Sequence, residues 1–295
     1  MKTVKRYDYK KLDDLLNSDP EYPHIHLVDM PYRITSTWQD YGCEVGIWER
    51  GSQVMAWATF QPAWWNLDFA VHSSLQGTEI EQEIFLWGKE QMLAYSKRTG
   101  EQFWGSVELF EATPTTAQTI KNLEAVGFTP FDWTIIRFEL DLGQELPQVQ
   151  LPAGYKIRPL QGMSEVQSYV KLHQAAFDSE KMTIEWRTRT LNHPAHRPEL
   201  DLILENDQKV PVGFCVCWQR DDIGQIEPLG VHPDYQGMGL GKALEFSAYQ
   251  TLKKHGVRLL KVDHASFNET AIALSLKTGF RQTNRALRYY IDVES

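Results

Sequence analysis

Hydrophobic positions in the second half of the chain switch repeatedly between a strand-like and a helix-like spacing. Short apolar or alternating runs predict strands at 155–160, 200–204, 211–218, 225–231, 259–264 and 287–292. Apolar residues three and four positions apart predict helices at 163–177, 183–191, 240–254 and 268–277. Strands and helices therefore mix along this half, as they do in α/β and α+β domains.

The first half repeats much of this order. We predict strands at 43–49, 54–60, 67–71 and 103–109 and helices at 79–98 and 115–126. Three dipeptides also match between the halves in the same order, namely Val71-His72 with Val231-His232, Gln76-Gly77 with Gln236-Gly237, and Gly127-Phe128 with Gly279-Phe280. Self-similarity over so long a period indicates an internal duplication.

The segment between the two copies has the composition of a linker. Residues 141–154 contain two prolines and two glycines and show little apolar periodicity. A chain of 295 residues is also long enough for two domains of about 150 residues each. We therefore predict a first domain at 1–142, a linker at 143–154 and a second domain at 155–295.

Composition and charge restrict the classes of partner. A formal net charge of −9 disfavours nucleic acid, because binding phosphate backbones requires clustered Lys and Arg. No apolar run approaches the roughly 18 residues that cross a bilayer, and the first residues lack the apolar core of a signal peptide, so we expect a cytoplasmic protein without membrane contact. The three cysteines suit a reducing compartment. The spacing of Cys215 and Cys217 resembles no zinc site, so no metal is expected.

A glycine-rich turn carries the strongest chemical signal. It reads Gln236-Gly237-Met238-Gly239-Leu240-Gly241 and lies between a predicted strand and a predicted helix. Alternating glycines let successive backbone N–H groups turn toward an anion, and the start of a helix adds its positive dipole end. The spacing is too short for a nucleotide P-loop, Ala243 stands where that motif needs Ser or Thr, and the dinucleotide motif G-x-G-x-x-G does not match. The turn therefore predicts a pyrophosphate cradle of another type.

Two motifs together resemble the GNAT N-acetyltransferase superfamily. The glycine-rich turn is similar to its Q/R-x-x-G-x-G/A motif, and Asn268, Ala271 and Gly279-Phe280 resemble its second signature in the expected order. The resemblance covers nearly all of residues 155–292. It implies an α/β (α+β) fold of two tandem GNAT-like domains, each with a mixed, mostly antiparallel sheet flanked by helices.

The resemblance also implies a binding site for acetyl-coenzyme A, between the strand that ends at Val231 and the strand at 259–264. Backbone groups of residues 229–231 would pair with the pantetheine arm, residues 236–243 would hold the pyrophosphate, and Asn268 would contact the arm from the other side. The implied cofactor-binding residues are Leu229, Gly230, Val231, Gln236, Gly237, Met238, Gly239, Leu240, Gly241, Lys242, Ala243 and Asn268.

The first half departs from this motif. Aligned without a gap, Glu79 and Glu81 stand at the positions of Gly239 and Gly241. Two carboxylates would repel phosphate and block the backbone donors. We therefore expect that the first half does not bind coenzyme A, and that it serves as a scaffold or as a wall of the acceptor pocket.

Acyl transfer to an amine needs a general base, because an alkylamine with a pKa of about 10 is mostly protonated at neutral pH. Glu227 lies four residues before Val231 on the same predicted strand. The resemblance implies that a carboxylate at this place is the general base, usually through a water molecule. A purely structural glutamate is the alternative, and His232, which sits in the turn, and His264 are further candidate bases.

The sequence departs from the family at the position of the usual general acid. The family commonly places a Tyr four residues before the Gly-Phe pair, and this chain has Ser275 there. A serine hydroxyl is a poor acid. Either the thiolate leaves unaided or another group substitutes, for which the candidates are Tyr235, Tyr289 and Tyr290.

These observations predict an acetyl-coenzyme A-dependent N-acetyltransferase that acts on the amine of a small molecule or an amino acid derivative, by direct attack assisted by a base. A coenzyme A-binding regulator without turnover and a protein N-acetyltransferase stay open as alternatives. The segment 177–198, which we expect to shape the acceptor pocket, carries no recognisable motif. The duplication favours a monomer, since the second domain can replace a homodimer interface, and a homodimer stays open.

Overall fold

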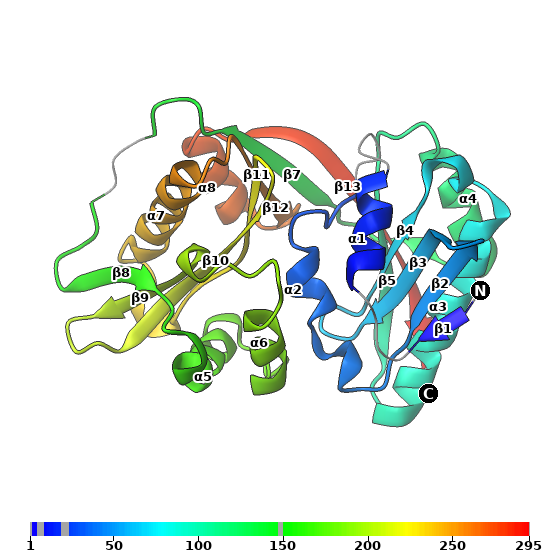
Figure 1. Ribbon diagram of the computed structural model, residues 1–295, viewed down its shortest axis with the longest axis horizontal. Coiled ribbons are helices and arrows are strands. Elements are labelled where there is room, and N and C mark those ends of the chain that lie inside the picture. The colour runs from blue at the N-terminus through cyan, green and yellow to red at the C-terminus, as the bar shows by residue number, and fades with distance from the viewer. Residues whose placement is uncertain (1, 5–8, 19–23, 147–149, 295) are drawn as a thin grey trace.

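A computed structural model describes residues 2–4, 9–18, 24–146 and 150–294. The chain forms two lobes, one built from each half, and the strands β7 and β13 cross from one lobe to the other (Figure 1). Within the described ranges, no helix is both long and apolar enough to cross a membrane.

The first half contains the following elements in chain order: β1 (Lys2–Val4), α1 (Tyr9–Ser18), α2 (Met30–Ile34), β2 (Val45–Arg50), β3 (Gln53–Gln61), β4 (Asn66–Val71), α3 (Glu79–Thr99), β5 (Phe103–Phe110), α4 (Thr116–Val126), β6 (Thr129–Pro130) and β7 (Ile135–Asp141). The second half contains β8 (Tyr155–Pro159), α5 (Val166–Phe177), α6 (Ile184–Leu191), β9 (Asp201–Asn206), β10 (Pro211–Arg220), β11 (Ile223–Val231), α7 (Leu240–Lys254), β12 (Leu259–Ala265), α8 (Glu269–Lys277) and β13 (Arg281–Val293). Short 3-10 helices lie at Thr37–Gln39, Ser73–Leu75, Gly162–Glu165, Pro198–Leu200 and Pro233–Tyr235. All the helices and strands expected from the periodicity are present, whereas α1, α2, β1, β6 and β7 were not predicted.

The internal duplication is visible in matching hydrogen bonds. The backbone N–H of His72 donates to Met55 O at 2.8 Å, and that of His232 donates to Val212 O at 2.9 Å. The side-chain amides of Gln76 and Gln236 donate to Val71 O and Val231 O at 3.3 and 3.1 Å. Equivalent residues therefore make equivalent contacts, which confirms the predicted repeat and the mixed α/β fold of each half.

Thirteen strands of the described residues belong to one sheet, because the halves exchange their last strands. β7, from the first half, pairs antiparallel with β12 of the second half, with Asp141 opposite Leu259 and Ile135 opposite Ala265. β13, the last strand of the second half, pairs with β5 of the first half and with β7. The domain boundaries given above stay a prediction, and residues 147–149 of the expected linker lie outside the described residues.

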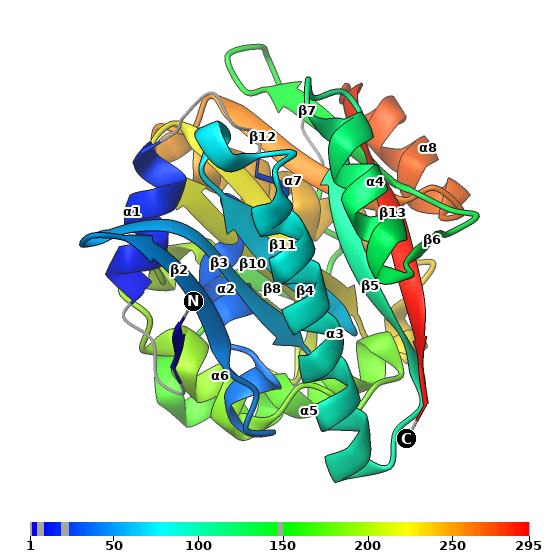
Figure 2. The ribbon, with the colours of Figure 1, turned by 90° about the vertical axis from the view of Figure 1, so that its right-hand side faces the viewer.

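Helices cover the sheet on both faces and join the two lobes. Figure 2 shows α3 and α4 over one face of the first half's strands. On the side facing the second lobe, Tyr32 of α2 is buried with its ring 4.9 Å from that of Trp186 on α6, and the indole N–H of Trp186 donates to Tyr32 O at 3.3 Å. Arg189 of α6 pairs with Asp40 at 2.7 Å. The first half therefore packs directly against α6, the helix of the expected acceptor segment.

Candidate active site

A pocket opens where two parallel strands of the second half separate. β11 and β12 pair only from Ile223 to Gln225, opposite Leu259 to Lys261, and the rest of β11 has no partner on this side within the described residues. The space between them holds about 370 Å³. Its lining includes Glu227 and Leu229 of β11, Gly241, Lys242 and Glu245 of α7, Asp263 and His264 of β12, and Asn268, Ala271 and Ser275 around α8.

The glycine-rich turn reaches this pocket through its last residue, Gly241, in the first turn of α7. Gly237 and Gly239 adopt left-handed backbone angles with φ of 76° and 78°, and Gly239 is the N-cap of α7. A Cβ atom added at either glycine would meet nothing within 4 Å. No side chain therefore occupies the space beside these two glycines, as the binding of an anion at a helix start requires.

The predicted cofactor residues divide into two groups. Leu229, Gly241, Lys242 and Asn268 line the pocket together with Glu227. The others, Gly230, Val231, Gln236, Gly237, Met238, Gly239, Leu240 and Ala243, are not among the lining residues. Leu240 and Ala243 have side chains buried in the core, so only their backbone can face a ligand. Gly230 instead faces β10 and α5, where an added Cβ would come within 2.6 Å of the Phe214 ring of β10 and 3.0 Å of Ala176 of α5.

Glu227 presents a carboxylate with an altered acidity. Its backbone carbonyl accepts a hydrogen bond from the Trp218 indole at 2.7 Å, which fixes β11 at this point. The side chain has no hydrogen bond or ion pair to any described residue. Burial raises the pKa of Glu227 to about 7, with a further contribution from the negative charge of Asp29, while Arg33 and His26 oppose the shift. A carboxylate of this pKa can accept a proton near neutral pH.

Asp29, Arg33 and His26 all belong to the first half. Their charges act on Glu227, so the two lobes meet close to this carboxylate. The first half therefore helps to set the acidity of the candidate base, which the sequence did not indicate.

The opposite wall of the pocket carries a serine and a histidine in contact. The ring Nε2 of His264 lies 2.7 Å from Oγ of Ser275. The three tyrosines considered as substitutes for an acid do not line this pocket; Tyr289 and Tyr290 lie on β13 beside β5, and Tyr235 follows the end of β11.

Glu245 and Leu274 line the pocket and were not predicted, although helical spacing could have found them. Glu245 lies four residues after the predicted Gly241 on α7, and Leu274 lies three residues after Ala271 on α8, and residues three and four apart are neighbours on a helix. Phe177 begins the segment 177–198 that was expected to shape the acceptor pocket. Asp263 carries no such signal, because it reaches the pocket through the packing of separate elements.

The corresponding cleft of the first half is nearly filled. β4 and β5 pair at Asn66 and Leu67, and the cavity beyond this pairing holds about 30 Å³. At its glycine turn, the carboxylate of Glu81 accepts a hydrogen bond from the backbone N–H of Gly77 at 2.9 Å. The same carboxylate accepts from the Thr119 hydroxyl at 3.1 Å and from the Asn122 amide at 3.0 Å. A side chain of the protein thus occupies the position where an anion would bind.

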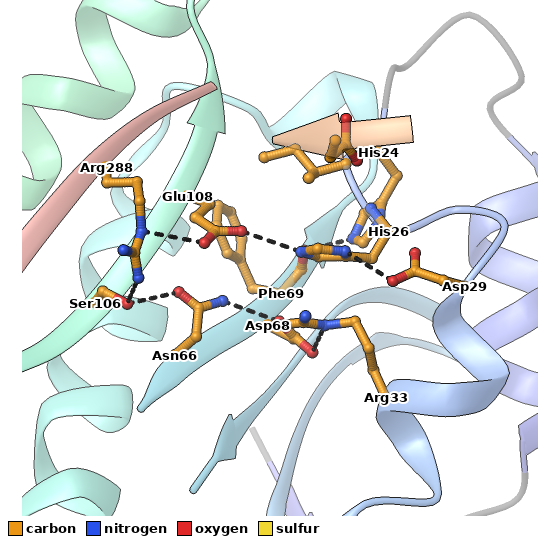
Figure 3. A network of polar contacts seen from close by, with 12 residues as sticks. His24, His26, Asp29, Arg33, Asn66, Asp68, Phe69, Ser106, Glu108 and Arg288 are labelled. Atoms are coloured by element: carbon orange, nitrogen blue, oxygen red, sulfur yellow. Dashed lines mark hydrogen bonds and ion pairs between the residues drawn. The ribbon is translucent and has the colours of Figure 1, made fainter. Parts of the chain in front are cut away.

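A buried network of charged residues fills the rest of this cleft (Figure 3). His24 donates from Nε2 to Phe69 O at 2.9 Å, on the strand that borders the cleft. His26 bridges Asp29 at 3.2 Å and Glu108 at 3.1 Å. Burial and Arg33 lower the pKa of His26, but the two carboxylates outweigh them and raise it to about 9. The backbone carbonyl of Phe69 on β4 therefore already accepts a hydrogen bond from a side chain of the protein, that of His24.

Residues 166–280 match the model of a family described as the acetyltransferase (GNAT) family. The matched stretch begins at the first residue of α5 and ends at the buried Phe280 after α8. It includes β11, the glycine-rich turn, α7, β12 and α8, which are the elements that line the pocket.

Curated relatives are similar over about half of the chain. A mycothiol acetyltransferase from Geodermatophilus obscurus is 25% identical over 153 residues, which cover 45% of this chain and 47% of that protein. One from Paenarthrobacter aurescens is 28% identical over 156 residues, which cover 49% and 48%. This chain therefore spans about half the length of the curated relatives that it matches.

Two solved structures have the same fold over nearly the whole chain. A tandem GNAT protein from the clavulanic acid biosynthesis pathway superposes with a TM-score of 0.67 at 15% identity, covering 96% of this chain and 94% of that one. A GCN5-related N-acetyltransferase from Sphaerobacter thermophilus superposes with a TM-score of 0.63 at 17% identity, covering 92% and 93%. The expected tandem arrangement is confirmed at the level of the fold.

Proposed function

We propose that this chain transfers an acetyl group from acetyl-coenzyme A to the amine of a small molecule, because residues 166–280 match the model of the acetyltransferase (GNAT) family. The observation that carries the proposal is the carboxylate of Glu227. It has a pKa of about 7, it has no partner among the described residues, and it lines a pocket that reaches Gly241, the last residue of the glycine-rich turn.

The pocket fits coenzyme A at both of its ends. Backbone N–H groups within residues 237–242 would hold the pyrophosphate, because those of Gln236 and Ala243 already donate to Pro233 O and Gly239 O. Backbone groups of the segment 229–231 would pair with the pantetheine arm, since this edge of β11 is unpaired. Asn268 uses its side-chain oxygen to accept from Ala271 N at 3.1 Å, which leaves its NH₂ group free to donate to the arm. When bound, acetyl-coenzyme A supplies an acetyl group activated as a thioester.

Glu227 would take the proton that the attacking amine must lose, directly or through one water molecule. With a pKa of about 7, much of the carboxylate is ionised at neutral pH and still basic enough to accept a proton. Its position on β11, two residues before Leu229, places it beyond the stretch that would pair with the arm, where the acetyl group would end.

The acceptor is proposed to be a small amine or an amino acid derivative. A protein substrate would need an open groove beside Glu227. Instead, the first half covers the α5–α6 side of the second half through Tyr32, which is 2% exposed, and through the Asp40–Arg189 ion pair. The curated relatives are named mycothiol acetyltransferases, and they also act on a small molecule by that name. The cytoplasmic location and the monomeric state stay proposals.

Calorimetric titration of acetyl-coenzyme A into the full chain tests the proposal, together with thioester loss in the presence of pooled small amines. Wild type should bind one equivalent and consume the thioester only when amine is present. The double variant Gly239→Glu/Gly241→Glu, which copies the first half, should lose binding. Gly256→Glu is the matched control, because Gly256 has a similar φ of 89° and open space around it, at the far end of α7.

The alternative functions predict other results. A coenzyme A-binding regulator would bind one equivalent and show no amine-dependent thioester loss. A protein N-acetyltransferase would prefer peptides over free amines in the same assay. Retention of binding by the double variant would show that the glycine-rich turn is not the cofactor site.

A further inference from the structure

Glu245 is an ionisable residue of the pocket that the proposed reaction does not use. It lies in the second turn of α7, four residues after Gly241 and therefore on the same face of the helix, and it lines the pocket. Glu245 is only 9% exposed. A carboxylate in so buried a place is costly unless it is paired or takes up a proton.

The carboxyl group of Glu245 has one partner and one free oxygen. Its Oε1 accepts a hydrogen bond from the hydroxyl of Tyr249, one turn further along α7. Its Oε2 accepts no hydrogen bond from any described residue. Burial raises the pKa of Glu245 above its ordinary value, and the hydrogen bond from Tyr249 and the positive charge of Lys242 oppose this only in part. Oε2 is therefore available to a ligand in the pocket.

The elements packed around Glu245 bring mostly acidic or uncharged groups toward it. β10 contributes the buried thiols of Cys215 and Cys217, and burial, Cys217 and the charge of Glu245 raise the pKa of Cys215. β9 and the 3-10 helix at Pro198–Leu200 contribute leucines to the same core. The ionisable residues that β11 and β12 present to the pocket are Glu227, Asp263, which is paired with Arg137, and His264, whose pKa is lowered by burial. An anion that enters the pocket near Glu245 therefore meets a like charge.

Coenzyme A would bring negative charge to this end of the pocket. The glycine-rich turn reaches the pocket at Gly241, and Gly241 and Glu245 are four residues apart, which is about 6 Å along a helix. Like charges at such a distance repel each other strongly where water is scarce. The ligand also displaces solvent from the pocket. Both effects disfavour the carboxylate form of Glu245 and favour the carboxylic acid.

We propose that Glu245 binds the pantetheine arm of coenzyme A as a neutral carboxylic acid, so that binding takes up one proton from solvent. The inference rests on the proposed function, because it takes coenzyme A to be the ligand of this pocket. In the complex, Oε1 keeps its hydrogen bond from Tyr249, and the new O–H group at Oε2 donates to an amide carbonyl of the arm. The proton returns to solvent when the coenzyme leaves.

The direction of the pH dependence follows from this proton. Glu245 loses its proton at a lower pH in the free protein than in the complex. Between these two pH values the coenzyme binds together with a proton, so its dissociation constant rises with pH, by at most about tenfold per pH unit. Below both values Glu245 is already protonated, and this dependence disappears.

Calorimetric titration of acetyl-coenzyme A into the full chain, without an amine, tests the proposal. The titration is repeated between about pH 6 and 8 in two buffers of different ionisation enthalpy, and the difference in heat gives the number of protons taken up. Wild type should take up more protons than Glu245→Gln, by up to about one per site. Comparing the two proteins cancels the protons exchanged by Glu227 and by the 3′-phosphate of the ligand.

Glu245→Gln should also bind the coenzyme well, because the amide copies the neutral acid. Its side-chain oxygen can accept from Tyr249, and its NH₂ group can donate to the arm. The dissociation constant of wild type should therefore rise about tenfold more between about pH 6 and 8 than that of Glu245→Gln.

Two further variants separate this role from a structural one. Tyr249→Phe removes a hydrogen bond that favours the carboxylate, so the pH range of proton uptake should move upward while the uptake itself persists. Glu269→Gln is the matched control, because it removes the same charge at an exposed position in the first turn of α8, next to Asn268 of the pocket. It should leave proton uptake unchanged.

The outcomes distinguish the two proposals. If wild type binds acetyl-coenzyme A and Glu245→Gln takes up the same number of protons at every pH, the proposal about Glu245 is wrong and the proposed acetyltransferase function stands. An equal loss of uptake in Glu269→Gln would also overturn it, because the removal of any nearby charge would then be enough. If wild type does not bind the coenzyme at all, both proposals fail.

Discussion

The carboxylate of Glu81 accepts a hydrogen bond from the backbone N–H of Gly77, 2.9 Å away, at the start of α3. The equivalent turn of the second half has Gly241 in place of this glutamate and is open. In the first half, the carboxylate of Glu81 therefore occupies the turn where an anion would bind. The equivalent turn of the second half has no side chain in this place.

We predict that Glu81 stabilises the first half. Glu81→Gln removes a charge from a buried group that accepts hydrogen bonds from Gly77, Thr119 and Asn122. The free energy of unfolding should fall by about 1–3 kcal/mol, measured by urea denaturation. Glu79→Gln is the control, because Glu79 is exposed in the first turn of the same helix and should change stability by less than about 0.5 kcal/mol. Equal effects of the two substitutions would contradict this role.

The rate of acetyl transfer should depend on the ionisation of Glu227. The base acts as a carboxylate, so kcat/KM should rise with pH through a pKa of about 7. Glu227→Gln should lower kcat by about 10²- to 10⁴-fold and remove this limb of the profile. Binding of acetyl-coenzyme A, measured by calorimetry, should be unchanged. A variant with wild-type kcat would exclude Glu227 as the base.

The same carboxylate should make stability depend on pH. Its pKa in the folded protein, about 7, lies above the ordinary value of 4.5, so the folded state holds a proton that the unfolded state has lost between these values. The stabilising contribution is complete below pH 4.5 and is lost as the pH rises through 7. Relative to wild type, Glu227→Gln should therefore gain stability between pH 5 and 8, by at most about 3 kcal/mol. Denaturation curves of both proteins at several pH values check this sign.

The exchange of end strands should make the two halves interdependent. A fragment of residues 150–295 lacks β7, so one edge of β12 is left unpaired, and Tyr289 and Val293 of β13 lose the first half's core in which they are buried. We expect no cooperative thermal transition from this fragment alone, and a single transition from the full chain. Calorimetry of both would test this. A fragment that melts cooperatively at the temperature of the full chain would contradict it.

Much of the site could be predicted from the sequence because it depends on local rules. The glycines at 237 and 239 are needed for left-handed angles, and the periodicity places α7 at Leu240–Lys254 as observed. The candidate base Glu227 came from the resemblance to the family, and the structure places it in the lining of the pocket. By contrast, the contact between His264 and Ser275 joins two elements, and neither residue's neighbours in the sequence indicate it.

The sequence by itself determined the duplication, the order of helices and strands in both halves, and the open turn of the second copy, since backbone conformation and hydrophobic period act over a few residues. Only the tertiary structure decided which strand pairs with which. β13 and β5 are about 180 residues apart in the chain, and their pairing depends on which sheet edge remains open once both halves have formed. The acidity of Glu227 was also decided there, because burial and the charge of Asp29 come from packing between the two halves.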